Sequence, residues 1–315
     1  MTGPVLVTGA GGFAGSHLVE LLAGNGQNGR VEVVGWGRSA PPPEVAARAT
    51  WERIDLLDRD RVRDAIRRLR PRAIYHCAGL PHVGQSWQQS AATLAGNALA
   101  THHLLDALSR AGVRARVLIT GTSYVYAPGE QPIGEDGPLA PTGPYAISKF
   151  AQEQLALYAG RHDGLEVVVA RPFNHTGPRQ QPSFVAPAVA RQVALIERGA
   201  MPPVLKVGNL EATRDLTDVR DVVRAYHALM TTAAPGSIYN VASGSGRTIR
   251  AVVDALVARA RVRIAVEIDP ERFRPSDVPI LVGDASRLRQ LTGWVPEIPF
   301  ERTLDDLLDY WRQQA

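Results

Sequence analysis

The sequence is poor in cysteine and lysine, and it has no long apolar run. Its one cysteine, Cys77, excludes intrachain disulfides and a cysteine-based structural zinc site. No segment approaches the roughly 20 consecutive apolar residues that a bilayer-spanning helix needs. The amino-terminal residues show neither a basic segment followed by an apolar one nor a cleavage site, so we expect a cytoplasmic protein.

The basic residues are scattered, and almost all of them are arginine. The 35 basic residues exceed the 31 acidic ones, which gives a formal net charge of +4, but no segment concentrates them as a nucleic-acid-binding arm would. This pattern favours an anionic small molecule as the partner. Only Lys149 and Lys206 are lysines, so a lysine at either position carries more information than an arginine would.

Apolar, β-branched runs alternate with amphipathic stretches through the first half of the chain. This alternation predicts an α/β fold, a Rossmann-like doubly wound parallel sheet with a smaller C-terminal substrate-binding lobe. The helix at 144–160 has clear boundaries, because Pro144 suits the first helical position and Gly160 suits the stop. We expect strands at 5–8, 31–35, 73–78, 117–120 and 166–170, helices at 16–24, 58–69, 91–111 and 144–160, and an irregular loop at 38–49.

After Arg171 prolines interrupt the chain, and helices alternate with short strands. We expect helices at 184–198 and 219–231 and strands at 204–207 and 237–241. The predicted division is therefore 1–170, mainly a dinucleotide-binding Rossmann domain, and 171–315, mainly a substrate-binding lobe. Some segments of the second part are expected to return to the first.

The first strand runs directly into a glycine-rich turn and then a helix. The spacing fits G-x-x-G-x-x-G at Gly9, Gly12 and Gly15, and also G-x-G-x-x-A at Gly9, Gly11 and Ala14. Glycines permit the tight turn and the close approach of a pyrophosphate, and the helix N-terminus supplies N–H donors. The strand before and the helix after the turn are the context that a dinucleotide site requires.

The end of the second strand indicates which dinucleotide is preferred. NAD sites usually place an Asp or Glu there to bind the ribose 2′-hydroxyl, whereas this chain has Gly37 followed by Arg38. A guanidinium pairs well with a 2′-phosphate. The sequence therefore favours NADP(H), with Arg38 as a cofactor-binding residue.

A tyrosine and one of the two lysines share a helix face. Tyr145 and Lys149 are four residues apart, and Thr122 ends a preceding strand. We expect the ammonium to lower the pKa of the phenol and the threonine hydroxyl to hold a substrate oxygen beside it. Thr122, Tyr145 and Lys149 are the predicted catalytic residues. None of the histidines has metal-ligand spacing with a partner, and no metal is expected.

These pieces resemble the extended short-chain dehydrogenase/reductases, which act on nucleotide sugars. The resemblance implies that Phe13 joins the glycine turn in binding the cofactor, that Asp55 and Leu56 hold the adenine, that Ala78 lines the cofactor cleft, and that Tyr145 and Lys149 also contact the cofactor. The matching motifs span the chain in the family's order: Gly9/Gly12/Gly15, Asp55-Leu56, His76-Cys77-Ala78-Gly79, Asn97, Thr122, Tyr145/Lys149 and Arg171-Pro172-Phe173-Asn174.

The second half resembles the GDP-mannose branch of that family, which holds GDP-mannose 4,6-dehydratases and GDP-4-keto-6-deoxy-mannose reductases. The resemblance implies that Asn174, Arg191, Arg214 and Arg274 contact a GDP-linked sugar, and several bidentate arginines suit a diphosphate. It also implies a homodimer formed by the helices at 91–111 and 144–160.

A dehydratase needs a carboxylate just after the catalytic threonine, where this chain has Ser123 and Tyr124; Glu130 and Glu135 lie beyond the motif. We therefore predict an NADPH-dependent reduction of the C4 keto group of a nucleotide sugar. The expected substrate is GDP-4-keto-6-deoxy-D-mannose, and the product a GDP-6-deoxyhexose such as GDP-D-rhamnose. The alternatives are a 4-epimerase with tightly bound NAD, the 4,6-dehydratase, and a non-catalytic NADP-binding regulator.

Overall fold

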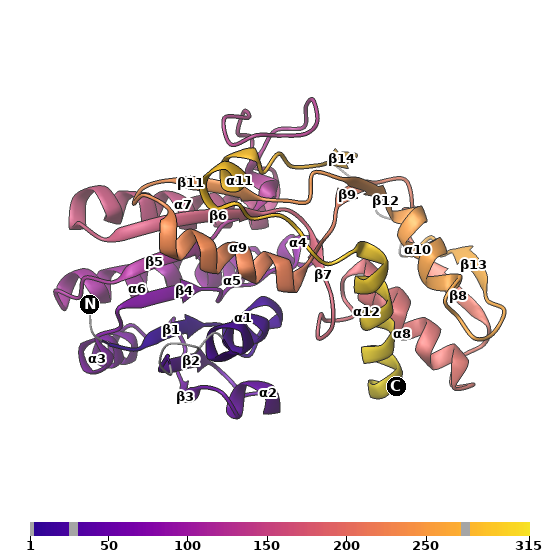
Figure 1. The fold of residues 1–315 in the computed structure, drawn as a ribbon, viewed down its shortest axis with the longest axis horizontal. Helices are drawn as coiled ribbons and strands as arrows, with labels where there is room; N and C mark the ends of the chain where they lie inside the picture. Colours follow the sequence, from indigo (N-terminus) through magenta and orange to yellow (C-terminus); the bar gives the residue numbers. More distant parts are fainter. Residues whose placement is uncertain (1–2, 25–30, 272–277) are drawn as a thin grey trace.

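A seven-stranded parallel sheet forms the centre of the first lobe (Figure 1). The structure, a computed structural model, describes residues 3–24, 31–271 and 278–315. The strand order β11-β6-β5-β4-β1-β2-β3 is that of a Rossmann fold, so the predicted fold class is confirmed. The strands are β1 (Val5–Thr8), β2 (Val33–Gly37), β3 (Thr50–Arg53), β4 (Ala73–His76), β5 (Arg116–Thr120), β6 (Glu166–Pro172) and β11 (Ile238–Val241).

Both faces of this sheet are covered, because successive strand residues point to opposite sides. Val5 and Val7 belong to one core cluster, which α1 (Phe13–Gly24) and α9 (Val219–Thr232) complete. Leu6 belongs to the other, which contains residues of α3 (Arg59–Leu69), α6 (Ala100–Arg110) and α7 (Gly143–Asp163). Buried parallel strands need this covering, and it accounts for their continuous apolar runs.

A second lobe with its own apolar cluster lies beyond the end of the sheet (Figure 1). Its helices are α8 (Val185–Glu197), α10 (Ile249–Val257) and α12 (Phe300–Gln314), and β8 (Val204–Val207) pairs in parallel with β13 (Ala265–Ile268). A three-stranded sheet, β12 (Gly246–Thr248), β9 (Thr213–Asp215) and β14 (Ile280–Leu281), lies beside it.

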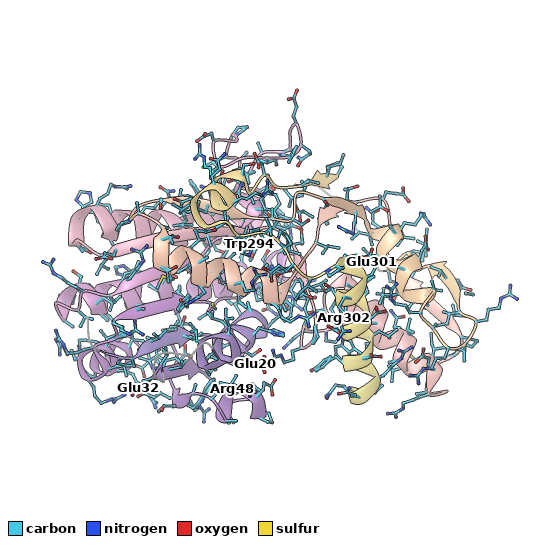
Figure 2. All side chains as sticks on the ribbon, viewed as in Figure 1. Glu20, Glu32, Arg48, Trp294, Glu301 and Arg302 are labelled. Carbon is cyan, nitrogen blue, oxygen red and sulfur yellow. The ribbon has the colours of Figure 1, made fainter. Side chains whose placement is uncertain are left out.

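The chain crosses between the lobes more than once after residue 171. β7 (His175–Thr176) and β10 (Thr217–Asp218) pair in parallel, while α9, β11 and α11 (Ser286–Thr292) return to the large sheet. Trp294, which follows α11, packs on α9 and donates its indole N–H to the Asp221 carbonyl at 3.0 Å (Figure 2).

The region expected to be an irregular loop is more ordered than predicted. It contains α2 (Pro43–Ala46), and the edge strand β3 directly follows it. The predicted helix at 91–111 is interrupted: α5 (Ser90–Leu94) leads into a π-helical turn (Ala95–Leu99) before α6 begins. Such a turn changes the phase of the helix within a run that is apolar on both sides of it, and its Gly96 alone does not distinguish it from a continuous helix.

The predicted stop of α7 at Gly160 is wrong. The helix continues to Asp163, and Gly164 ends it in the left-handed conformation with φ of 69°. Gly160 lies inside the helix, close to Val167 of β6. Smaller differences affect β2, which spans 33–37 rather than 31–35, and β6, which extends to Pro172. In the part of the chain that the structure describes, no helix is both long and apolar enough to cross a membrane.

Candidate active site

The glycine-rich turn at the carboxyl end of β1 exposes backbone atoms that no side chain covers. Gly9 has φ of +67°, and a Cβ added to it would lie 2.7 Å from the backbone N of Ala78. A Cβ on Gly15 would lie 2.2 Å from the Gly9 carbonyl oxygen, to which the Gly12 N–H also donates at 2.9 Å. Side chains are therefore excluded at Gly9 and Gly15. The result is the shape of a pyrophosphate cradle at the N-terminus of α1.

Phe13 joins this turn to the second lobe. Its ring, at the first position of α1, stacks on His175 of β7 with centroids 5.6 Å apart and planes 5° apart. Burial lowers the pKa of His175. A neutral imidazole on the Phe13 ring makes this an apolar contact next to the glycine turn.

The residues expected around the adenine lie at the carboxyl ends of neighbouring strands. Asp55 is exposed and accepts the Leu57 N–H at 3.0 Å, while the carbonyl of the buried Leu56 accepts from His103 Nδ1 at 2.9 Å. The Ala78 N–H donates to Thr8 Oγ1 at 3.3 Å and so lies beside β1.

Arg38 follows β2 directly and is exposed, so its guanidinium is accessible from solvent. Its carbonyl oxygen accepts a hydrogen bond from Arg53 Nε at 2.7 Å. Two arginines thus lie together at this edge of the sheet, and Gly37 leaves the place of the usual acid without a side chain. Sequence reasoning missed Arg53, because β3 itself was not predicted.

Thr122 and Tyr145 are brought together, so that the threonine hydroxyl acts on the pKa of the phenol. Thr122 follows β5 and caps a short 3₁₀ turn, accepting the Tyr124 N–H at 3.3 Å, and Tyr145 lies in the first turn of α7. Burial raises the pKa of Tyr145 to about 12, and the bond from Thr122 offsets only part of this effect. The phenol is therefore protonated at neutral pH and can donate a proton.

Lys149 lies buried one helical turn further along α7. Its ammonium donates to the Thr120 carbonyl and, at 2.5 Å, to Gln152 Oε1, and burial lowers its pKa to about 8. The expectation that this ammonium lowers the pKa of Tyr145 is wrong for this structure. The charge is directed at β5 and Gln152, and burial of the phenol dominates.

A buried ion pair fixes α7 against the sheet. Arg171 on β6 is 2% exposed and donates to both carboxylate oxygens of Glu153, at 2.9 and 2.6 Å. It also donates to the Tyr126 hydroxyl at 2.9 Å, which in turn donates to Asn240 Oδ1 at 2.7 Å. This network links α7, β6, β11 and the segment after Thr122, so it holds the predicted catalytic side chains in register.

The π-helical turn supports the start of α7 from the other side. Asn97, within that turn, accepts the Leu80 N–H at 2.7 Å and donates to Ser148 Oγ at 2.9 Å. Ser148 Oγ donates to the Tyr145 carbonyl at 2.7 Å. Asn97, one of the motif residues that carry the family resemblance, is fully buried in the structure.

The predicted substrate residues come from separate elements of the chain. Asn174 follows β6, and its side-chain Oδ1 is buried without a hydrogen-bond partner among the described residues. Arg214 on β9 donates to the Thr213 and Pro279 carbonyls, at 2.7 and 3.3 Å. Arg191 is exposed on α8, and Arg274 lies outside the described residues. Backbone hydrogen bonds thus account for part of the donor capacity of Arg214.

Sequence reasoning missed Arg179, which connects the lobes. It takes the left-handed backbone conformation at φ of 72°, and its guanidinium donates to Glu20 at 2.6 Å and to His17 Nδ1 at 2.5 Å. His17 Nε2 lies 3.0 Å from the Pro178 carbonyl, and burial lowers the pKa of His17 to about 4. Within the described ranges, no group of three or more His, Cys, Asp or Glu could hold a metal ion.

The strand order, the glycine turn and the Thr122–Tyr145–Lys149 arrangement are the features of the extended short-chain dehydrogenase/reductase class. Residues 6–307 match the family model described as GDP-mannose 4,6 dehydratase. The chain is 36% identical over 324 residues to GDP-6-deoxy-D-mannose reductase of Pseudomonas aeruginosa, with 100% of this chain and 99% of that one covered. This chain therefore belongs to the GDP-mannose 4,6 dehydratase family.

Two solved structures are similar over nearly the full length. RMD from Pseudomonas aeruginosa complexed with NADPH gives a TM-score of 0.86 at 35% identity and covers 100% of both chains. The UDP-glucose 4-epimerase of Thermus thermophilus, in complex with NAD, gives a TM-score of 0.87 at 30% identity, covering 99% of this chain and 100% of that one. The family predicted from the motifs is confirmed. Of these two similar structures, one holds NADPH and the other NAD.

Proposed function

We propose that this protein reduces the C4 keto group of GDP-4-keto-6-deoxy-D-mannose with NADPH and yields a GDP-6-deoxyhexose such as GDP-D-rhamnose. The observation that carries the proposal is the pair of hydroxyl groups on Thr122 and Tyr145. Burial keeps the Tyr145 phenol protonated. Ketone reduction needs a proton donor at the oxygen that becomes the alcohol. The resemblance to a GDP-6-deoxy-D-mannose reductase and to an NADPH-bound structure supports the choice of substrate and cofactor.

In this proposal, the chain's own residues bind the cofactor, orient the substrate oxygen and protonate that oxygen. Gly9, Gly12 and Gly15 would hold the pyrophosphate, and NADPH, when bound, supplies the hydride. Phe13, Arg38, Asp55, Leu56 and Ala78 complete the proposed cofactor site. Thr122 orients the substrate oxygen, and Tyr145 protonates it. Lys149, whose pKa burial lowers to about 8, would hold the cofactor and return a proton to Tyr145.

The same region lacks what dehydration requires. Ser123 and Tyr124 occupy the positions where a dehydratase has its carboxylate. Glu130 is exposed, and Glu135 accepts the backbone N–H of Asn240 at 2.9 Å, on the β11 side. Reduction is the chemistry that the remaining groups support, since hydroxyl and ammonium groups cannot act as the carboxylate base that elimination needs.

The 4-epimerase remains the second candidate, because a similar structure is an epimerase in complex with NAD. Gly37 and Arg38 favour NADPH instead. We assign Asn174, Arg191, Arg214 and Arg274 to the substrate, with the arginines as ligands of the diphosphate. The unpartnered Oδ1 of Asn174 supports its place in this set.

We also propose a homodimer, working in the cytoplasm, where a reductase would meet free NADPH. Large apolar side chains stay exposed on the two helical segments expected to form the interface: Leu94, Leu99, Ile147 and Tyr158. An exposed set of this kind marks an interaction surface. Light scattering should give twice the chain mass of 34.0 kDa.

The direct test mixes the purified protein with NADPH and GDP-4-keto-6-deoxy-D-mannose made in situ. Loss of NADPH absorbance that depends on the keto sugar supports the reductase, and NMR of the product identifies the epimer at C4. NAD retained through purification, together with epimerisation of a nucleotide sugar and no NADPH oxidation, would favour the epimerase instead.

A further inference from the structure

One aromatic residue lies where the adenosine end of the cofactor would bind. Trp51 is on the edge strand β3, opposite Gly35 of β2 in the parallel register, and Arg53 is opposite Gly37. Strand residues two apart share a face, so Trp51 and Arg53 point to the same side of the sheet. That side carries the glycine-rich turn, because Trp51 packs against the cluster that contains Ala10.

The indole of Trp51 covers the end of β2. A Cβ added to Gly37 would lie 2.5 Å from two atoms of its six-membered ring, and one on Gly35 would lie 3.1 Å from the same ring. A Cβ on Gly11, in the turn itself, would come within 3.3 Å of it. Three glycines therefore surround one side of the ring, and no larger residue fits at Gly37 while Trp51 keeps this position.

The indole nitrogen adds a second observation. Trp51 is partly exposed, yet its Nε1 is buried and has no hydrogen-bond partner among the described residues. A buried donor without a partner is destabilising, and native proteins seldom keep one. Positive charge is available at the same sheet edge: the Arg53 guanidinium donates to the backbone carbonyl of Arg38, which directly follows β2 and is exposed.

We propose that Trp51 and Gly37 together select for the 2′-phosphate of NADP(H). The indole fills the space of the acid that binds a free ribose 2′-hydroxyl, so the site cannot hold that carboxylate. The aromatic surface packs against the phosphorylated ribose, and Arg38 and Arg53 supply the positive charge. This inference rests on the cofactor assigned in the proposed function, and it adds the residues that discriminate.

The test measures binding to cofactor-free protein by calorimetry, with NADPH, NADH, 2′,5′-ADP and 5′-AMP as ligands. Trp51→Ala should weaken the binding of NADPH and 2′,5′-ADP about tenfold, because the phosphorylated ribose loses the aromatic surface that it packs against, and should leave the binding of NADH and 5′-AMP nearly unchanged. Trp311→Ala is the matched control, because Trp311 of α12 also has a buried, unpartnered Nε1 and belongs to the second lobe.

A double-mutant cycle tests the pairing itself. Gly37→Asp alone should weaken the binding of both NADPH and NADH, because the new side chain collides with the indole of Trp51. In Gly37→Asp/Trp51→Ala the acid has room, and the preference for NADPH over NADH should fall at least about tenfold relative to Trp51→Ala. Thermal melts establish which variants are folded, and the Trp51→Ala result stands even where Gly37→Asp unfolds.

Unchanged binding of NADPH and 2′,5′-ADP to Trp51→Ala would overturn the proposal. The proposal would also be overturned if Gly37→Asp bound NADH as tightly as the double variant does. Asp at position 37 and Trp51 would then not compete for the same space. Quenching of intrinsic fluorescence by 2′,5′-ADP that is lost in Trp51→Phe but kept in Trp311→Phe supports it. Normal selectivity without turnover of the keto sugar would instead contradict the proposed function alone.

Discussion

The functional residues of the two lobes differ in how rigidly the fold positions them. In the first lobe, glycines expose backbone at the turn, and buried hydrogen bonds fix Thr122 and Tyr145. In the second lobe, the expected substrate residues are arginines such as Arg191, which is exposed, and Arg214, which donates to backbone carbonyls. A rigid site needs particular residues at particular spacings, whereas long side chains reach a ligand from many positions. Motifs are therefore more informative in the first lobe.

The largest effect should come from removing the proton donor of the first lobe. Tyr145→Phe should lower kcat for the keto sugar about 10²–10⁴-fold, the usual contribution of a general acid. NADPH affinity, measured by calorimetry, should change little. Tyr124→Phe is the matched control, because Tyr124 lies edge-on to Tyr145 with ring centroids 6.2 Å apart. Turnover by Tyr145→Phe near the wild-type rate would rule out its role as the acid.

Breaking the buried ion pair should have the next largest effect, on folding. Glu153→Gln leaves the Arg171 guanidinium buried without a counter-charge and should lower the free energy of unfolding by about 3–5 kcal/mol in urea titrations. Glu166→Gln is the control: Glu166 lies on β6, as Arg171 does, and its carboxylate, 47% exposed, pairs with Arg116. The control should lose less than about 1 kcal/mol. Equal losses in both would mean that burial does not set the cost.

Much of the first lobe could be predicted from the sequence, because its elements repeat with the periods of buried strands and helices. The edge strand β3 escaped prediction: Thr50 to Arg53 is short, polar and only partly buried, so it gives no apolar run. The same gap hid Trp51 and Arg53. The pKa of Tyr145 could not be predicted either, since it depends on burial by residues distant in sequence.

In the second lobe the sequence signals were weaker. Strands of two to four residues in three small sheets carry little periodicity. Arg179 was missed because its role depends on a left-handed backbone that brings it to His17 and Glu20 of α1. Contacts that join the lobes are long-range, and no local pattern encodes them.

The glycine turn should tolerate less change than the helix it begins. In Gly15→Ala the new Cβ meets the Gly9 carbonyl at 2.2 Å, so we expect a loss of about 1–3 kcal/mol in the free energy of unfolding and weaker NADPH binding. Gly24→Ala, at the other end of α1, meets nothing within 4 Å and should be neutral or stabilising by about 0.5–1 kcal/mol. Unchanged NADPH affinity in Gly15→Ala would contradict the cradle.

The contact between the lobes should weaken in acid. The pKa of His17 falls from 6.5 to about 4 because burial and the Arg179 charge disfavour the imidazolium, while Glu20 and Asp218 act in the opposite direction. The unfolded chain then binds a proton that the folded one does not. This stabilisation is complete above pH 6.5 and is lost as the pH falls towards 4, by up to about 3 kcal/mol.

The variant His17→Gln isolates that contribution, because its amide can donate to Pro178 and accept from Arg179 but does not titrate. Between pH 6.5 and 4 its free energy of unfolding should fall less than that of the wild type. His162→Gln, an exposed position on α7, serves as the control and should keep the wild-type slope. A slope in His17→Gln equal to that of the wild type would show that the imidazole is not the titrating group.

The smallest expected effect lies in the second lobe and sharpens the contrast between the lobes. Arg214 is held by two backbone carbonyls, whereas Arg191 is exposed on α8, so a substrate phosphate would find the first side chain partly positioned and the second not. Removing a positioned charge-assisted donor costs roughly 1.5–3 kcal/mol. Arg214→Ala should therefore raise the KM for the nucleotide sugar about tenfold or more, with NADPH affinity unchanged. Arg191→Ala should raise this KM less.

If both variants raise the KM equally, charge alone governs binding and the backbone contacts of Arg214 contribute nothing. If only Arg191→Ala raises the KM, the diphosphate lies nearer α8 than β9.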